Sequence, residues 1–501
     1  MAKFKRYDYS QKVLVPVSLE EQLVPGSLEF AIHTLIETRM DMSVFEGKYK
    51  NDATGRSAYD PKILLKVVLL GYSRGLISSR QIERACCENV TFMALSGNQR
   101  PDHSTIASFV SSMRDQILPL FCDILLVCEQ ENLLGGSFFA LDGVKLPSNA
   151  SKESSGTLSE LKKKKDKIQQ KVKRLLKDQI DADKDDDDDF RPPSNRQRQI
   201  DRLKKQADRI DKWLKQNEAK IGSGGRELKS NLTDNDSALM LTSGGTIQGY
   251  NGQALVDDKH QIIVHAAAFG SGQDAKQLEP MVDGAKANME KIGQRADYFK
   301  GKVLTADANY HNQSNLKKCH DEQIDVYIPD LKFRNRDSRF TNRPRKKTRK
   351  GKKFVLEDFK HDPQRDHYIC PNGKILKRNV KKHIRDHNIY RRYMADENDC
   401  ARCSLTHRCF YRKNTKRRSL DVPLGTDKTN FSKLMQDKVD SDRGRKIYPQ
   451  RFAVVEPVCA NIKTQKGLDR FTLRGKIKVN IQWLLYCMVH NIEKIMNFAA
   501  A

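Results

Sequence analysis

Apolar residues in the first 130 positions recur at the three- and four-residue spacing of helices, and polar residues mark where those helices begin. The clearest apolar face consists of Leu64, Val67, Val68 and Tyr72. Before it, Asp60 and Pro61 combine an N-cap acid with a proline at the first helical position. Ser79 and Asp102 precede two further helical patterns. The spacing therefore predicts an all-helical N-terminal part.

The segments after Ser79 and Asp102 are predicted to be two short helices joined by a polar turn. This arrangement is typical of a helix-turn-helix, whose second helix enters the major groove of DNA. His103 and Thr105 stand at the start of that second helix and are candidate DNA contacts. An ordinary helical bundle fits the same pattern, and both interpretations stay open.

Short apolar runs bounded by turn residues replace the helical spacing after position 137. Strands are expected at 138–145, 246–250, 253–256, 262–264, 303–304 and 324–328, and a helix at 274–285. Strands before helices, with one late strand, indicate a mixed α/β core. A final helical face follows, formed by Ile481, Leu484, Leu485, Met488, Ile492 and Ile495.

Residues 156–221 interrupt the core with two heptad patterns. Their seam positions are Leu158, Leu161, Lys165, Ile168, Val172 and Leu175, then Ile200, Leu203, Ala207, Ile210 and Leu214. Between the two arms stand the acidic run 185–189 and Pro192-Pro193, which cannot continue a helix. We therefore expect an antiparallel coiled-coil hairpin with a solvated acidic tip.

Residues 331–353 hold twelve Lys or Arg and one acid. A loop that follows DNA phosphates explains this charge better than a merely solvated loop, because acidic partners are missing nearby in the sequence. The candidate phosphate contacts are Arg345, Lys346, Lys347, Arg349 and Lys350. The stretch begins a basic and cysteine-rich insertion that extends to residue 433.

These patterns divide the chain into five parts. We expect a helical DNA-binding domain at 1–130 and a catalytic core at 131–155 and 222–330, completed by a helical part at 434–501. The coiled-coil hairpin at 156–221 and the insertion at 331–433 interrupt that core.

Charge then narrows the function. The 501 residues include 91 basic and 64 acidic side chains, a net charge of +27, which predicts a polyanionic partner. A basic surface kept for solubility is the alternative. No stretch reaches the roughly 18 apolar residues of a membrane span, and the N-terminus lacks the apolar region of a secretion signal. We therefore expect a cytoplasmic protein.

Four of the eleven cysteines crowd into one segment of the insertion. They are Cys370, Cys400, Cys403 and Cys409. Four thiolates can bind Zn²⁺ tetrahedrally, and a structural zinc would hold together an insertion that looks too polar for a core of its own. His407 can replace one cysteine, and reduced structural thiols are the alternative.

Three carboxylates are the strongest candidates for chemistry. Asp142 and Asp307 each follow an apolar run, and Glu456 lies in the C-terminal part. Acids on separate elements can hold two Mg²⁺ or Mn²⁺ ions about 3.5–4 Å apart, which clamp an in-line phosphoryl transfer. Near Glu456, Arg451 offers a planar fork for a phosphate and Lys463 a point charge; a helix would place Glu456 and Lys463 on one face. Asp234 and Asp236 are a further acidic pair, either a fourth carboxylate or a turn.

Taken together, these motifs resemble a DDE transposase of bacterial insertion sequences, IS1182-like within the IS4/IS5-type superfamily, over nearly the whole chain. The matching segments are Tyr59–Pro61, Arg100–Ile106, Leu141–Gly143, Gly249–Gln253, Ala306–His311, the set Tyr448, Arg451, Glu456 and Lys463, Leu473–Gly475, and His490-Asn491. Two departures stand out. Four residues separate Arg451 from Glu456, where the wider pattern has three, and Asn309 occupies a position where glycine is common.

The resemblance implies an RNase H-like core with Asp142, Asp307 and Glu456 as the metal-binding triad and Tyr448, Arg451 and Lys463 as its polar companions. It also implies cleavage of double-stranded DNA at transposon ends and transfer of the 3′-hydroxyl to target DNA, in a homodimer associated with the nucleoid. A DNA-binding descendant without activity and an RNA-directed nuclease are the alternatives. The intact triad argues against the first of these.

Overall fold

A computed structural model describes residues 18–49, 57–183, 195–222, 225–341, 353–379, 383–385, 388–412, 414–423 and 430–499. The chain divides into two compact units. One comprises Met1–Phe333 with Phe431–Ala501, and the other is Arg334–Asn430.

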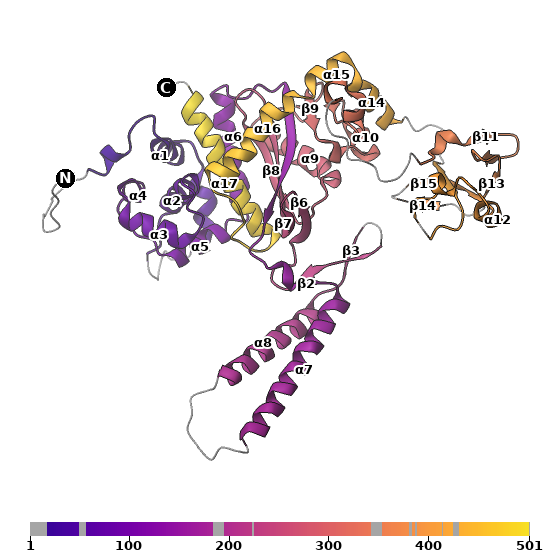
Figure 1. Cartoon of the computed structure of the whole chain (residues 1–501). Helices are drawn as coiled ribbons and strands as arrows, with labels where there is room; N and C mark the ends of the chain where they lie inside the picture. Colours follow the sequence, from indigo (N-terminus) through magenta and orange to yellow (C-terminus); the bar gives the residue numbers. More distant parts are fainter. Residues whose placement is uncertain are drawn as a thin grey trace, which may run out of the picture. The chain divides into compact units, whose positions relative to one another are not determined.

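A six-stranded sheet forms the centre of the first unit (Figure 1). Its strands are β1 (Phe138–Pro147), β6 (Ala238–Thr242), β7 (Gly245–Asp257), β8 (Ile263–Phe269), β9 (Val303–Ala306) and β10 (Asp325–Tyr327). Their order is β10-β9-β1-β7-β6, and β8 also pairs with β7. The strand β1 runs antiparallel to β7 and parallel to β9, which is parallel to β10. The expected mixed α/β core is confirmed.

One strand replaces the two that we expected between positions 246 and 256. The dipeptide Asn251-Gly252 suggests a turn, yet it lies inside β7 and pairs with β1 and β8. The glycine is needed for packing, because a Cβ on Gly252 would stand 3.1–3.2 Å from the ring of Trp483. The strand therefore continues through Asn251-Gly252, where the helix that carries Trp483 packs closely on the sheet.

The N-terminal part is helical, as expected. Its elements are η1 (Glu20–Gln22), α1 (Leu28–Thr38), η2 (Met42–Lys48), α2 (Pro61–Ser73), α3 (Ser79–Glu88), α4 (Val90–Leu95), α5 (His103–Ser111) and α6 (Ile117–Gln130). Asp60 caps α2 by accepting a hydrogen bond from Lys62 N at 2.8 Å, with Pro61 at the first position. Asp102 caps α5 in the same way. The connection between α3 and α5 differs from the prediction, since it contains the helix α4 instead of a simple polar turn.

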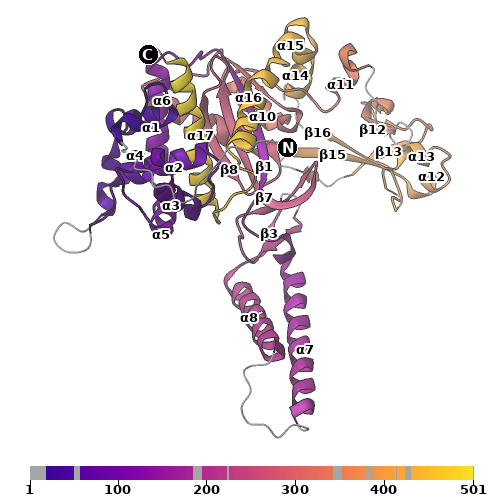
Figure 2. The same ribbon diagram turned by 60° about the vertical axis from the view of Figure 1, so that its left-hand side comes forward.

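The last helix, α17 (Lys476–Phe498), joins the sheet to the N-terminal helices (Figures 1 and 2). It packs on β8 with one side and on α6 and α2 with others. Every residue from Gln482 to Asn491 is therefore buried. The sequence predicted a single apolar face. The spacing within one helix does not reveal that the helix is covered by other elements on more than one side.

Two helices, α7 (Leu158–Asp183) and α8 (Asn195–Gln216), form the hairpin that interrupts the core (Figures 1 and 2). Val172, Ile200 and Leu203 are buried between them. Lys165, at the polar seam position, pairs with Asp211 at 2.8 Å. The acidic run 185–189 lies outside the described residues, and the supercoil of a coiled coil stays a prediction.

The base of this hairpin is closed by short strand pairs. The strand β2 (Ser155–Gly156) pairs with β5 (Ser230–Asn231), and β3 (Lys220–Ile221) pairs with β4 (Glu227–Leu228). Replacing residues 157–229 by a short glycine linker should therefore leave the sheet folded, with near-wild-type near-ultraviolet circular dichroism and a single thermal transition. Wholesale unfolding of this deletion variant would show that the hairpin is part of the core.

The remaining helices of the first unit cover the sheet or follow it. They are η4 (Asp274–Lys276), α9 (Leu278–Lys291), η5 (Ala308–Tyr310), α10 (Gln313–Asp321), α14 (Phe431–Asp440), α15 (Asp442–Ile447), α16 (Gln450–Ala460) and the π-helix η8 (Asn461–Gln465). The helix expected at 274–285 thus begins as a short 3₁₀ turn and continues as α9. None of the described helices is long and apolar enough to cross a lipid bilayer.

The second unit contains its own six-stranded sheet, in the order β11-β12-β13-β15-β14 with β16 on β15. Its elements, with α11 at the boundary, are α11 (Phe333–Arg336), η6 (Ser338–Phe340), η7 (Leu356–Asp358), β11 (Lys360–Asp362), β12 (His367–Ile369), β13 (Ile375–Arg378), β14 (His383–Arg385), β15 (Asn388–Ala395), α12 (Glu397–Ala401), α13 (Thr406–Cys409) and β16 (Ser419–Pro423). Its buried cluster is Phe354, Phe359, Tyr368, Leu376, Tyr393, Ala395 and Leu420. The expectation that this segment is too polar for a core is therefore wrong.

Candidate active site

Two adjacent parallel strands bring Asp142 and Asp307 together. In the β1–β9 pairing, Leu141 is the register partner of Ala306, so each aspartate is the next residue along its chain. The buried run Phe138–Leu141 fixes β1 at the centre of the sheet. Asp142 continues in β1, whereas Asp307 leaves β9 as the N-cap of the turn η5. Two carboxylates predicted separately from the sequence thus lie at the same edge.

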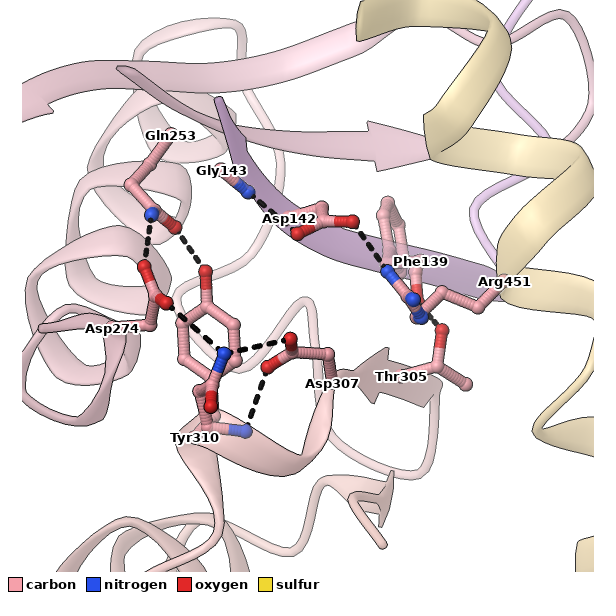
Figure 3. A network of polar contacts seen from close by, with 10 residues as sticks. Phe139, Asp142, Gly143, Gln253, Asp274, Thr305, Asp307, Tyr310 and Arg451 are labelled. Carbon is pink, nitrogen blue, oxygen red and sulfur yellow. Dashed lines mark hydrogen bonds and ion pairs between the residues drawn. The ribbon is translucent and has the colours of Figure 1, made fainter. Parts of the chain in front are cut away.

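Arg451, on α16, forms an ion pair with the first of these acids. Its Nη1 lies 2.5 Å from Asp142 Oδ2, and its side chain is only 6% exposed (Figure 3). The second oxygen of Asp142 accepts a hydrogen bond from Gly143 N at 2.8 Å. The Arg451 Nε is buried and lacks a hydrogen-bond partner among the described residues. One edge of the guanidinium therefore neutralises Asp142, and Nε keeps donor capacity.

The second acid responds to the charges around it. Burial raises the pKa of Asp307 above its ordinary value, the hydrogen bond from Asn309 N opposes this shift, and the charges of Asp142 and Asp274 add to it. Arg451 acts in the opposite direction. A carboxylate whose pKa is raised by neighbouring acids is stabilised in its charged form when a divalent cation binds beside it.

Asp274 is the acid that sequence reasoning missed (Figure 3). It follows β8 and was interpreted only as part of a helix. Its Oδ1 accepts hydrogen bonds from Asn251 Nδ2 at 2.6 Å and Gln253 Nε2 at 3.1 Å. Because β8 is antiparallel to β7 and β7 is antiparallel to β1, β8 and β1 run in the same direction. Asp274 therefore lies at the same edge as Asp307, a relation that only strand order reveals.

The Asp-x-Asp pair before β6 has a different role. Asp234 accepts hydrogen bonds from Tyr250 Oη at 2.8 Å and from Gly475 N at 3.2 Å. Asp236 accepts one from Lys476 N at 2.8 Å. Both acids thus hold the start of α17 against the sheet, and these contacts favour the structural alternative over a fourth carboxylate.

Glu456 lies on α16, five residues after Arg451, and its side chain is exposed. At 100° per residue, the two side chains point about 140° apart around the helix. Both still act on Cys459, whose thiol pKa burial raises to about 12, with Asp142 and Glu456 adding to the shift and Arg451 opposing it. Asp142 and Glu456 thus both lie near the Cys459 thiol.

The helix after Glu456 does not keep the phase that the sequence argument assumed. Pro457 lacks an N–H, so the Ala453 carbonyl instead accepts a hydrogen bond from Gln261 Nε2 at 2.9 Å. The backbone then widens into the π-helix η8, which carries the exposed Lys463. The prediction that Glu456 and Lys463 share one face of a regular helix is therefore wrong. Tyr448 is 9% exposed and packs edge-on against Phe333.

The DNA-contact candidates are placed only in part. His103 Nδ1 lies 3.0 Å from Glu83 Oε2, and the Thr105 hydroxyl donates to the cap residue Asp102 at 3.0 Å. Both side chains thus stabilise the start of α5 and are only partly exposed. The five basic residues predicted to contact phosphate, at positions 345–347, 349 and 350, lie outside the described residues.

The four cysteines of the second unit lie close to one another. Burial raises the pKa of Cys409, Arg418 opposes the shift, and the other three thiols add to it. Cys370, Cys400 and Cys409 pack against the apolar cluster of that unit. Lys374 N donates to Cys370 Sγ at 3.3 Å, and Asn372 Nδ2 to Cys403 Sγ at 3.5 Å. These contacts fit reduced structural thiols as well as a metal site.

Across the described parts of the chain, no group of three or more His, Cys, Asp or Glu side chains is already arranged to hold a metal ion. The zinc site therefore gains no support here, and the sharing of one position by Asp142, Asp307 and Glu456 stays a prediction. The chemistry of the pair Asp142–Asp307 nevertheless fits a divalent cation, because hard oxygen donors face one another across adjacent strands.

Family comparisons agree with this geometry. The family described as "Transposase DDE domain" matches residues 369–496, and "Transposase domain (DUF772)" matches residues 17–112. Both families are characteristic of insertion-sequence transposases. No curated protein matches the chain. The matched DDE domain implies an RNase H-like core, a divalent metal cofactor and DNA as the substrate.

Proposed function

We propose that this transposase cuts double-stranded DNA at transposon ends and transfers the exposed 3′-hydroxyl to target DNA, with Asp142, Asp307 and Glu456 as its metal-binding acids. The observation that carries the proposal is the pair Asp142–Asp307 on adjacent parallel strands, together with the buried Arg451 that neutralises one of them. Two-metal phosphoryl transfer needs neighbouring acids of this kind to hold the metal ions.

The chain's own groups have distinct tasks in this proposal. When bound, Mg²⁺ or Mn²⁺ supplies charge stabilisation and an activated water. Arg451 holds Asp142 in place and keeps a fixed positive charge beside the acids. Lys463, exposed on η8, adds a mobile positive charge to the approaching backbone. The Asn309 N–H fixes one oxygen of Asp307 at 2.8 Å. Tyr448 packs beside this site and stabilises α16.

The direct test is a cleavage and strand-transfer assay with duplex DNA that carries the element's terminal repeats. The proposal predicts divalent-dependent nicking at the repeat ends and joined products on a target plasmid. Binding without cleavage would favour an inactive DNA-binding descendant, and cleavage of RNA in preference to DNA would favour an RNA-directed nuclease. A homodimer that pairs two ends, acting in the cytoplasm at the nucleoid, completes the proposal.

We further propose that the N-terminal helices around Asp102–Phe109 select the transposon ends while the basic stretch Lys332–Lys353 contacts phosphates. Neutralising Arg345, Lys346, Lys347, Arg349 and Lys350 should weaken binding to all duplexes alike. The slope of log affinity against log salt should become shallower by about 0.9 for each phosphate that the variant no longer neutralises. Filter binding at several salt concentrations, with specific and scrambled end sequences, measures both the affinity and its salt dependence. A variant that keeps the slope but loses end preference would reverse this division of tasks.

The zinc prediction is tested separately on the second unit. Purification without chelator followed by elemental analysis should find about one zinc per chain if the four cysteines bind it. The double variant Cys400→Ser with Cys403→Ser should then lose the metal, whereas Cys87→Ser, at an exposed cysteine of α3, should keep it. Zinc-free wild-type protein that is fully folded would instead establish reduced structural thiols.

A further inference from the structure

We propose that Asp274 is a positioning residue of the active site, which orients Asp307 through the side-chain amide of Asn309 and so sets the affinity for the divalent cation. This inference rests on the proposed function and adds a fourth carboxylate to it. Asp274 itself does not contact the reacting atoms in this proposal. Its task is to fix the geometry of Asp307, which binds the cation.

The carboxylate of Asp274 is held rigidly from the sheet side. Its Oδ1 accepts from Asn251 at 2.6 Å and from Gln253 at 3.1 Å, and both amides are 0% exposed. Gln253 is held in turn at two points. Tyr310 Oη donates to its side-chain Oε1, and Trp483 Nε1 donates to its backbone carbonyl at 3.0 Å. A buried network of this kind permits little movement of Asp274.

The space for this network is provided by Gly143, the residue after Asp142. A Cβ on Gly143 would stand 2.0 Å from Gln253 Nε2 and 2.7 Å from Asn251 Oδ1. The two amides therefore cross directly over the backbone beside Asp142 to reach Asp274. Asn251 Oδ1 has no hydrogen-bond partner in the described chain although it is buried. A free oxygen acceptor in this place favours a site that is completed by a ligand, such as a cation with its water.

Asn309 connects Asp274 to Asp307. Its Nδ2 donates to Asp307 Oδ2 at 3.0 Å and lies 3.4 Å from Asp274 Oδ2, while its backbone N donates to Asp307 Oδ1 at 2.8 Å. Both oxygens of Asp307 are thus oriented by Asn309, and Asp274 draws the side-chain amide of Asn309 to its own side. The longer contact is the weaker one, so Asp274 acts by orientation more than by bond strength.

The two backbone turns that carry these residues are also fastened together. Asn312 Nδ2 and Asn315 Nδ2 both donate to the Ala275 carbonyl at 2.9 Å. The turn η4, which contains Asp274, therefore cannot shift without the segment that follows Asp307. The backbone of Asp274 is thus fixed to the segment that follows Asp307, and both carboxylates contact the side-chain amide of Asn309. This is the placement of a positioning residue.

The test uses full-length protein and three variants: Asp274→Asn, Asn309→Ala and the double variant. Calorimetric titration with Mn²⁺ alone should show about tenfold weaker binding for each single variant, the lower end of what outer contacts to ligands contribute. The double variant should also lose about tenfold rather than hundredfold, because both residues act along one path. The rate of end cleavage should fall with unchanged duplex affinity, and excess Mn²⁺ should restore part of it.

A matched control is Asp283→Asn, which removes the same charge from α9, where Asp283 pairs with Lys318 at 2.8 Å on the surface. It should bind Mn²⁺ as the wild type does. Unchanged Mn²⁺ affinity in Asn309→Ala, or additive losses in the double variant, would overturn the inference. Asn309 is exposed, so this variant remains informative even where Asp274→Asn fails to fold. A wild-type protein that binds Mn²⁺ but cuts no DNA would overturn the proposed function alone.

Discussion

Asp142→Asn and Asp307→Asn are each expected to reduce cleavage at transposon ends at least about 10³-fold while duplex binding stays within about twofold. Both acids stand at one edge of the sheet, and each variant removes a hard oxygen donor while keeping the shape of the side chain. Single-turnover nicking of end DNA in Mg²⁺ measures the rate, and a gel-shift assay in Ca²⁺ measures binding.

Asp283→Asn again provides the control, because it removes an equal charge from the surface of α9. Its rate should match that of the wild type. Retention of more than about a tenth of the wild-type rate in either active-site variant would be incompatible with the proposed roles of Asp142 and Asp307. Glu456→Gln belongs to the same series, and a wild-type rate there would remove Glu456 from the triad.

Arg451→Gln is expected to have the second-largest effect, and that effect should depend on divalent cations. Removing the guanidinium leaves Asp142 beside Asp307 without a positive charge, which should lower the free energy of unfolding by about 2–3 kcal/mol in cation-free buffer. This loss is smaller than that expected for a fully buried ion pair, because the Asp142 side chain is 25% exposed. Added Mg²⁺ should stabilise the variant more than the wild type, since a bound cation replaces the missing charge.

Urea denaturation with and without Mg²⁺ measures this difference, and cleavage should fall by about 100-fold in parallel. The control Arg443→Gln breaks an exposed ion pair with Asp325 and should change stability by less than about 1 kcal/mol. Equal stability of Arg451→Gln and wild type without Mg²⁺ would show that the Arg451–Asp142 pair contributes nothing to the fold.

Local patterns were sufficient for several parts of the site. The apolar runs before Asp142 and Asp307 predicted two strands, and both strands are present. Cap signals at Asp60 and Asp102 predicted helix starts that the structure confirms. Such signals act over three or four residues, so neighbours along the chain determine them.

Other parts depended on packing that no short segment contains. Asn251-Gly252 resembles a turn, but both residues pair with β1 and β8 inside β7, and Trp483 of α17 packs close to Gly252. The π-helix after Pro457 changed the phase on which the Glu456–Lys463 argument relied. The second unit proved to have a core of its own, because its scattered aromatic residues converge only when its strands pair.

The sequence by itself thus determined most strand and helix elements, the basic charge, and two acids that follow strand-forming apolar runs, because these follow from spacing and side-chain type. It did not show that Asp142 lies inside β1 instead of at its end. Only the tertiary structure decided that Asp142 and Asp307 are neighbours, that Arg451 neutralises the first, and that Asp274 joins them through Asn309. The physical reason is strand order: β1, β8 and β9 run in the same direction, so residues far apart along the chain meet at one edge. Which edge an acid reaches is a property of the whole sheet, and no single strand encodes it.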